Sequence, residues 1–223
     1  MKATLLIPAL SVLVPTVAFA QPEESESSTA FDHHVAPADH AFEISVGTGY
    51  TQGGGKLGEG MLDLEDVAGP GGSANIELGY RIIPHLTVGA YGSFARYANG
   101  DSLTDDVNVL AATAGVQAAW HFRPDRSVDP WVSLGAGWKG LWLDPDQGKA
   151  TALQGFELAR LQVGVDYRIS PEVSIAPVIG GGLGMYVAQD SAMTTEYSEI
   201  DGKKVNFTGF AGVAGRFDLG GRR

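Results

Sequence analysis

Residues 205–219 read VNFTGFAGVAGRFDL, and this stretch decides the fold. Successive side chains of a strand point to opposite faces, so the stretch predicts a strand with one apolar face and one small, polar face. Phe207 and Phe217 share the apolar face. At about 3.3 Å per residue they lie roughly 33 Å apart, which a tilt of about 40° reduces to roughly 25 Å. That is the height of a lipid-facing band, so we predict a membrane-spanning strand.

The same alternation of apolar with small or polar residues recurs in seven earlier stretches. They cover about 42–51, 73–82, 86–94, 110–122, 132–142, 159–167 and 172–187. Short connections (82–85, 123–130 and 169–172) alternate with long ones (52–72, 98–106, 143–150 and 188–204). Short turns on one side and long loops on the other are typical of barrels that cross the bacterial outer membrane. We therefore predict an all-β fold over residues 41–219, an eight-stranded antiparallel up-and-down transmembrane β-barrel with periplasmic turns and extracellular loops.

The composition and the two ends of the chain agree with an exported protein. The chain has 223 residues, a formal net charge of −11, 31 glycines and no cysteine. This acidic balance argues against a nucleic-acid partner, which needs a basic surface.

Residues 1–20 are predicted to be a signal peptide, because Lys2 precedes an apolar stretch that ends in Ala18-Phe19-Ala20. Residues 21–40 are expected to form a disordered acidic periplasmic tail, and residues 220–223 a C-terminal tail.

The glycine-rich face of the strands also carries the charged residues. In a soluble, lipocalin-like barrel the polar face would meet water and the apolar face would line a ligand cavity. The interior of an eight-stranded barrel is just wide enough for side chains, so glycines there make room for long charged groups. We therefore expect an interior network of both signs, formed by Glu43, Glu77, Arg81, Lys139, Arg160, Asp166, Arg216 and Asp218.

The aromatic residues of the apolar face fall near the two ends of the predicted strands. Such rings form girdles at the two membrane interfaces. Tyr80, Trp120, Phe122, Tyr167 and Phe217 lie near the short-turn end, and Tyr50, Phe94, Trp142 and Phe207 near the long-loop end.

On this alternation, the loop asymmetry and the signal, residues 41–219 resemble the OmpA-like and OmpW-like group of small outer-membrane barrels. The resemblance implies an integral protein of the bacterial outer membrane whose partners are outer-membrane lipid and the barrel-insertion machinery. It also implies a C-terminal aromatic residue that this machinery reads. The chain departs from that pattern, because Phe217 and Leu219 are followed by Gly-Gly-Arg-Arg.

The sequence contains no complete catalytic or cofactor motif, and we expect neither an enzyme nor a cofactor. Gly53-Gly54-Gly55-Lys56 resembles a phosphate-binding loop, but Leu57 replaces the required Ser or Thr, so we expect a flexible extracellular loop. His121 is the only strand histidine and is expected to point inward, unlike the lipid-facing histidine of barrels that trim lipid A.

Metal binding is left open at three places. The tail carries His33, His34 and His40 near Asp32 and Asp39, at a spacing that matches no rigid site. Asp144-Pro145-Asp146 resembles the start of a calcium loop without its later Glu. The long loops are acidic, which solvation of surface loops explains; the functional alternative is that divalent cations bridge them to outer-leaflet phosphates or that they meet a cationic partner. Their acids are Glu59, Asp63, Glu65, Asp66, Asp101, Asp105, Asp106, Asp144, Asp146, Asp190, Glu196, Glu199 and Asp201, against Lys56, Lys149, Lys203 and Lys204.

The pattern predicts a non-enzymatic integral outer-membrane protein with a structural or surface-interaction role and an interior filled by side chains. One alternative is a transporter of small hydrophobic molecules, with a lateral exit at the glycine-rich seventh strand (Gly180, Gly181, Gly182 and Gly184). A lipid-modifying outer-membrane enzyme is the third hypothesis.

Overall fold

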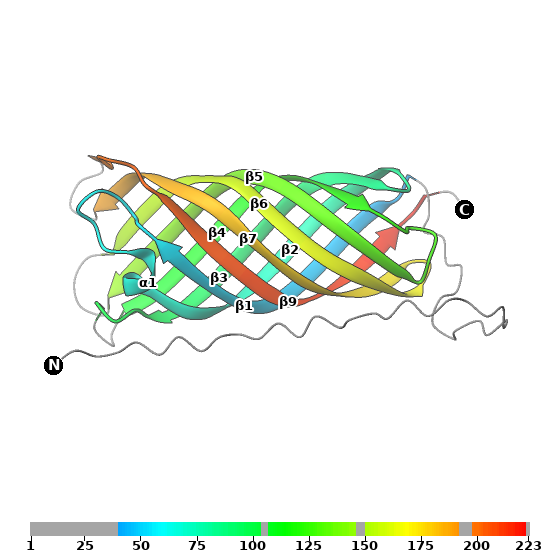
Figure 1. The fold of residues 1–223 in the computed structure, drawn as a ribbon, viewed down its shortest axis with the longest axis horizontal. Coiled ribbons are helices and arrows are strands. Elements are labelled where there is room, and N and C mark those ends of the chain that lie inside the picture. The colour runs from blue at the N-terminus through cyan, green and yellow to red at the C-terminus, as the bar shows by residue number, and fades with distance from the viewer. Residues whose placement is uncertain (1–39, 104–106, 146–149, 192–197, 222–223) are drawn as a thin grey trace, which may run out of the picture.

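The computed structural model describes residues 40–103, 107–145, 150–191 and 198–221, so the predicted signal peptide and nearly all of the tail lie outside the described residues. The described residues form a closed antiparallel barrel (Figure 1), in which each long strand pairs with the next and β9 pairs with β1. This confirms the predicted eight-stranded up-and-down barrel. Its strands are β1 (Phe42–Gly55), β2 (Ala68–Ile83), β3 (Leu86–Asn99), β4 (Val107–His121), β5 (Val128–Pro145), β6 (Thr151–Ser170), β7 (Val173–Ser191) and β9 (Val205–Leu219).

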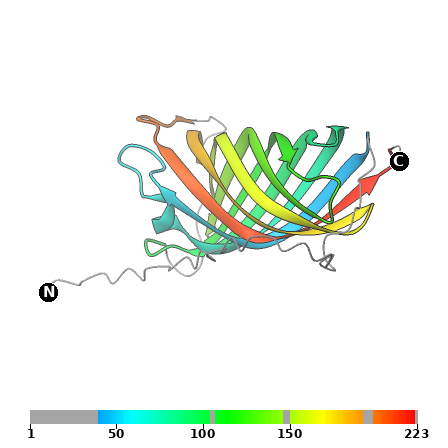
Figure 2. The same cartoon turned by 45° about the vertical axis from the view of Figure 1, so that its right-hand side comes forward.

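Two small elements belong to the long connections of the barrel. Helix α1 (Leu64–Val67) lies in the connection between β1 and β2, and β8 (Ser198–Glu199) pairs with the end of β7. The helix lies at the end of the barrel opposite the one at which β9 ends (Figures 1 and 2). Within the described ranges, no helix is long and apolar enough to cross a membrane.

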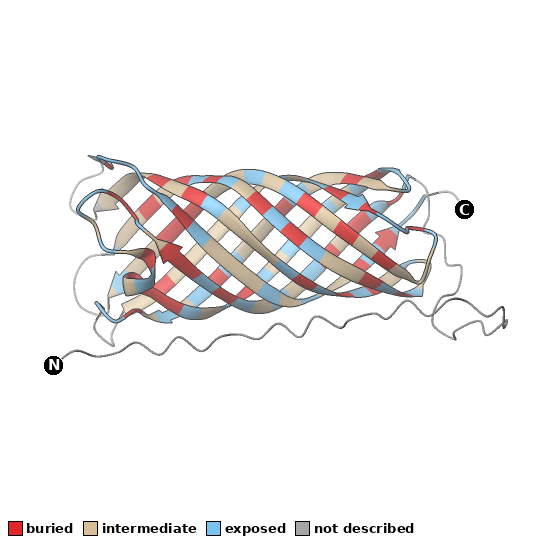
Figure 3. Cartoon of the chain, in the orientation of Figure 1, coloured by how far each residue is buried: buried red, intermediate tan, exposed pale blue. Residues whose placement is uncertain are grey.

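Apolar side chains point out of the barrel and polar side chains point into it. Val116 is 69% exposed and Ile179 is 61% exposed, whereas Arg81 is 1% exposed and Asp166 is fully buried. Figure 3 shows buried and exposed positions alternating along the strands. This orientation is opposite to that of a soluble barrel with an apolar cavity, so the soluble alternative is wrong.

Glycines on the inner face of β7 lie opposite long polar side chains of neighbouring strands. A Cβ added at Gly180 would clash with Gln162, one at Gly182 with the carboxylate of Glu157, and one at Gly184 with Lys139. No larger residue fits at these positions without displacing an interior polar group. This is the steric role that the sequence predicted for the inward glycines.

The strands extend further toward the long-loop end than the alternation indicated. β2 begins at Ala68 rather than near residue 73, and β1 continues through the glycines 53–55. The expectation of a flexible loop at residues 53–56 was therefore wrong. The backbone of Lys56 continues the pairing as an isolated antiparallel β-bridge with Asp63. Alternation fails here because the turn-like sequence AGPGG, residues 68–72, shows no apolar period even though its backbone continues the ladder.

The connection between β1 and β2 folds over the mouth of the barrel. The N–H of Gly100 donates to the carbonyl of Val67 at 3.2 Å, and that of Ser102 to the carbonyl of Asp66 at 3.1 Å, so this connection is tied to the next loop. Under it lies a cluster of buried apolar side chains that we call the cap. It consists of Leu57, Leu64, Val67, Ala68, Val109, Leu141, Leu153, Tyr186 and Ile200.

Candidate functional site: the barrel interior

The part of the interior near the short turns is filled by ion pairs between strands far apart in the sequence. Arg81 on β2 contacts Glu43 on β1 at 2.7 Å and Asp218 on β9 at 2.9 Å. Arg168 on β6 contacts the same Asp218 at 3.1 Å. Because each of these side chains is almost fully buried, neutralisation by the partner is what makes their burial tolerable.

Arg216 on β9 connects this group to a second carboxylate. It contacts Glu43 at 3.2 Å and Asp166 at 2.7 Å, and its guanidinium lies 4.7 Å from the ring centre of Trp131. The indole N–H of Trp131 donates to the other oxygen of Asp166 at 3.0 Å. The indole of Trp131 therefore packs against the guanidinium of Arg216 and also donates a hydrogen bond to Asp166, the carboxylate that pairs with Arg216.

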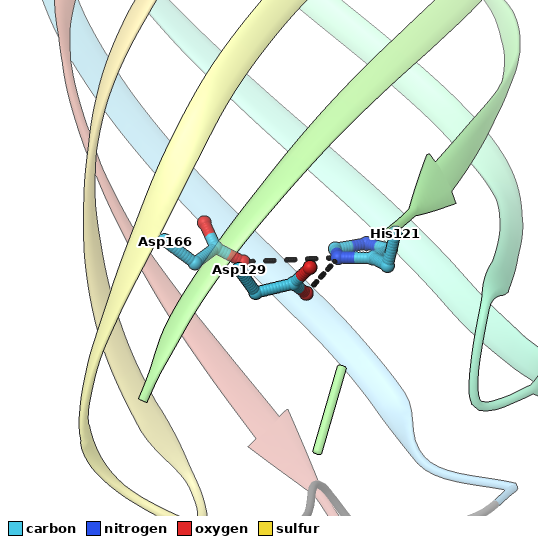
Figure 4. A group of neighbouring side chains, drawn as sticks. All are labelled: His121, Asp129 and Asp166. Carbon is cyan, nitrogen blue, oxygen red and sulfur yellow. Dashed lines mark hydrogen bonds and ion pairs between the residues drawn. The ribbon is translucent and has the colours of Figure 1, made fainter. Parts of the chain in front are cut away.

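His121, Asp129 and Asp166 form a buried cluster at the edge of this network (Figure 4). The Nδ1 atom of His121 lies 2.7 Å from Asp129 Oδ2 and 3.9 Å from Asp166 Oδ2. The backbone N–H of Arg123 donates to Asp129 Oδ1 at 2.8 Å. The donor atoms are close enough together to hold a metal ion. Each of the four carboxylate oxygens already has a hydrogen-bond partner in His121, Arg123, Trp131 or Arg216, so the cluster is accounted for as part of the ion network.

In the part of the interior near the cap, the buried cations have different partners. Lys139 donates to the amide oxygen of Asn206 at 2.7 Å and lies 4.8 Å from the ring centre of Tyr186. The guanidinium of Arg160 lies 4.4 Å from the ring centre of Tyr91, whose hydroxyl donates to Glu157 at 2.6 Å. Here cations lie on aromatic rings and amides rather than on carboxylates.

The structure brings together five of the eight predicted interior residues. Glu43, Arg81, Asp166, Arg216 and Asp218 form one ion-pair network. The other three, Glu77, Lys139 and Arg160, lie outside it. With its amide oriented so that both atoms find partners, Gln162 links Glu77 at 3.1 Å to Arg160 at 2.9 Å.

Sequence reasoning did not assign three charged residues to the interior, namely Asp129, Glu157 and Arg168, and it did not indicate one hydrogen bond there. Arg168 follows Asp166 at the inward spacing of two, and Asp129 precedes the inward Trp131 at the same spacing, so a longer reading of each strand would have found both. Glu157 has the wrong spacing from Arg160 and points inward only because of a bulge between Glu157 and Ala159. Alternation places Tyr91 on the inward face, but it does not indicate the hydrogen bond from Tyr91 to Glu157.

The predicted girdle residues point outward. Tyr50, Tyr80, Phe94, Trp120, Phe122, Tyr167, Phe207 and Phe217 are all exposed. Trp142 is partly covered, and its ring centre lies 5.9 Å from that of Trp138. Leu219, like Phe217, is exposed at the end of β9.

The described acids of the long loops do not gather in a common site. The ammonium of Lys203 donates to Glu199 and holds the pKa of that exposed carboxyl below its usual range. The N–H of Asp63 donates to Asp66 Oδ2 at 3.3 Å. Among the described residues, His121, Asp129 and Asp166 are the only three potential ligands gathered closely enough for one metal ion. Outside the described residues lie Asp105, Asp106, Asp146, Lys149, Glu196 and the tail residues 32–34 and 39.

Comparison with known proteins gives the fold a context. No protein-family model matches the sequence, and no curated protein matches it significantly. Neisserial surface protein A is similar, with a TM-score of 0.51 and 17% identity over 79% of this chain and 96% of that chain. The fold is that of a small outer-membrane barrel. OprG of Pseudomonas aeruginosa is also similar, with a TM-score of 0.49 and 9% identity over 83% of this chain and 99% of that chain. At these identities the likeness concerns the fold alone.

Proposed function

We propose that the protein is a non-enzymatic integral protein of the bacterial outer membrane, with a structural or surface-interaction role carried by its extracellular loops. The observation that supports this most directly is the occluded interior. Ion pairs fill the end near the short turns, and the cap closes the mouth. A barrel that is filled near the short turns and covered at its mouth is suited to a scaffold role rather than to a wide pore.

The outer surface supports lipid as the surrounding partner. Exposed apolar side chains cover the middle of the strands, and two sets of outward aromatic rings flank them, as at membrane interfaces. We propose that these rings are the two girdles. Phe217 and Leu219, exposed at the end of β9, are the residues we propose for recognition by the barrel-insertion machinery.

Two measurements test this function. The protein, folded into planar bilayers, should show no stable conductance of porin size, and such a conductance would contradict a closed scaffold. Cell fractionation should recover the protein in the outer membrane with heat-modifiable migration on a gel, whereas recovery in the soluble periplasm would contradict the proposed location.

A transporter of small hydrophobic molecules is the second candidate, and one feature of β7 favours it. Gly181 lines an internal cavity and also an outer apolar hollow formed with Leu161, Val163 and Ile179. Only strand backbone separates the two at this position. Gly209, the register partner of Gly181, has room for a side chain on the lipid side.

Uptake of a small apolar dye into vesicles would distinguish the two candidates. A transporter should accelerate uptake, and Gly209→Leu, which fills the outer surface beside the exit, should slow it. If the wild-type barrel is no faster than protein-free vesicles, the transporter hypothesis is wrong and the closed scaffold stands.

A further inference from the structure

A chamber lies inside the barrel between the ion network and the cap. It has a volume of about 60 Å³, room for about four water-sized spheres. Leu64 and Tyr186 of the cap border it, and Lys139, Glu157 and Arg160 supply its charged lining. Hydroxyl side chains complete the wall, namely Thr51, Ser73, Ser93, Thr113 and Thr208.

Neither cation of the chamber is in direct contact with a carboxylate, although Glu157 lines the same chamber as Lys139 and Arg160. Lys139 is 6% exposed and Arg160 is 8% exposed. Neither forms an ion pair with an acid in the described part of the chain. By contrast, Arg81, Arg168 and Arg216, near the short turns, all do. Burying a charge is costly unless it is neutralised, so a missing counter-charge requires a physical explanation.

Polar groups of the chamber lining also lack partners. The Oγ of Ser73, the Nδ2 of Asn75 and the Nε of Arg160 are buried and find no hydrogen-bond partner among the described residues. All three can donate a hydrogen bond. Unsatisfied donors together with unpaired cations are complementary to a ligand that carries negative charge and accepts hydrogen bonds.

The one carboxylate of the chamber belongs to Glu157, which keeps its negative charge. Glu157 accepts from the hydroxyl of Tyr91 at 2.6 Å, and it packs against Gly182 on β7. The charged lining of Lys139, Arg160 and Glu157 therefore carries a net charge of +1. We propose that the chamber binds one small oxyanion, of the size of phosphate or sulfate, held by Lys139 and Arg160.

The cap determines how such an anion enters. Leu64 and Tyr186 of the cap, both almost fully buried, border the chamber on the side of the long loops. An anion enclosed when the barrel folds would therefore exchange slowly in the folded protein. Retention after folding is the property to measure.

The first experiment folds the full chain into detergent with radiolabelled phosphate, removes free phosphate by gel filtration and counts the label per barrel. Wild-type protein should retain one phosphate per barrel. Lys139→Met should lower retention roughly tenfold or more, because a charge-assisted hydrogen bond is lost. Lys204→Met is the matched control, because Lys204 is exposed and does not line the chamber. No retention by wild-type protein, or equal retention by both variants, would overturn the proposal.

A second measurement uses wild-type protein alone, so it does not require any variant to fold. Crystals of wild-type protein folded with selenate should show anomalous density in the chamber, within hydrogen-bonding distance of Lys139. Density for water alone, or selenate only on the outer surface, would overturn the proposal even if Lys139→Met failed to fold.

Discussion

Replacing Arg81 with methionine removes the guanidinium that neutralises two carboxylates at once. Its nitrogens lie 2.7 Å from Glu43 and 2.9 Å from Asp218, and its side chain is 1% exposed. Methionine keeps much of the length of the side chain but supplies neither charge nor donors. Arg81→Met therefore tests whether interior ion pairing, rather than interior packing, stabilises the barrel.

The expected cost follows from the remaining partners. Removing one member of a buried ion pair costs about 3–5 kcal/mol, because a charge remains buried and uncompensated. Glu43 retains Arg216 at 3.2 Å, and Asp218 retains Arg168 at 3.1 Å. We therefore expect the lower end, a loss of about 3 kcal/mol in the free energy of unfolding.

Urea unfolding in lipid vesicles, followed by tryptophan fluorescence, measures this loss. Arg96→Met is the control, because Arg96 is exposed and its hydrogen bond to Asn108 contributes little. Adding Glu43→Gln to Arg81→Met should restore part of the stability, because the negative charge that lost Arg81 is then removed while Arg216 keeps Asp166 at 2.7 Å. If Arg81→Met unfolds at the same urea concentration as Arg96→Met, the reasoning is refuted.

Three further predictions concern packing inside the barrel. Gly182→Val should lower the free energy of unfolding by about 1–3 kcal/mol, because the new side chain would overlap Glu157, and urea unfolding measures it. Trp131→Phe should cost about 1–3 kcal/mol in the same assay, because a buried oxygen of Asp166 loses its donor. Leu64→Ala should loosen the cap and increase tryptic cleavage after Lys56, while the barrel strands stay protected on a gel.

The strand faces could be predicted from the sequence because a period of two survives wherever one face meets lipid and the other is enclosed. That period by itself assigns Arg81, Arg216 and Asp218 to the interior. It could not pair them, since Arg81 and Asp218 lie 137 residues apart and meet only when β9 closes on β1 in one register.

The period of two is interrupted at a bulge in β6. The bulge beside Glu157 reverses the spacing for part of β6, so its carboxylate could not be assigned to the interior. The cap was missed for another reason. Leu57, Leu64 and Val67 lie in a connection without alternation, and their burial depends on contacts with strands remote in the sequence.

The central claim is that the apolar outer face of the strands contacts acyl chains. The chain contains no cysteine, so single-cysteine spin labels at Val116 on the outer face and at Lys204 in a loop can be compared in lipid bilayers. The account predicts that the label at Val116 collides with oxygen dissolved in the bilayer and is shielded from a water-soluble nickel complex, with the opposite result at Lys204. Equal access of the nickel complex to both labels would contradict it.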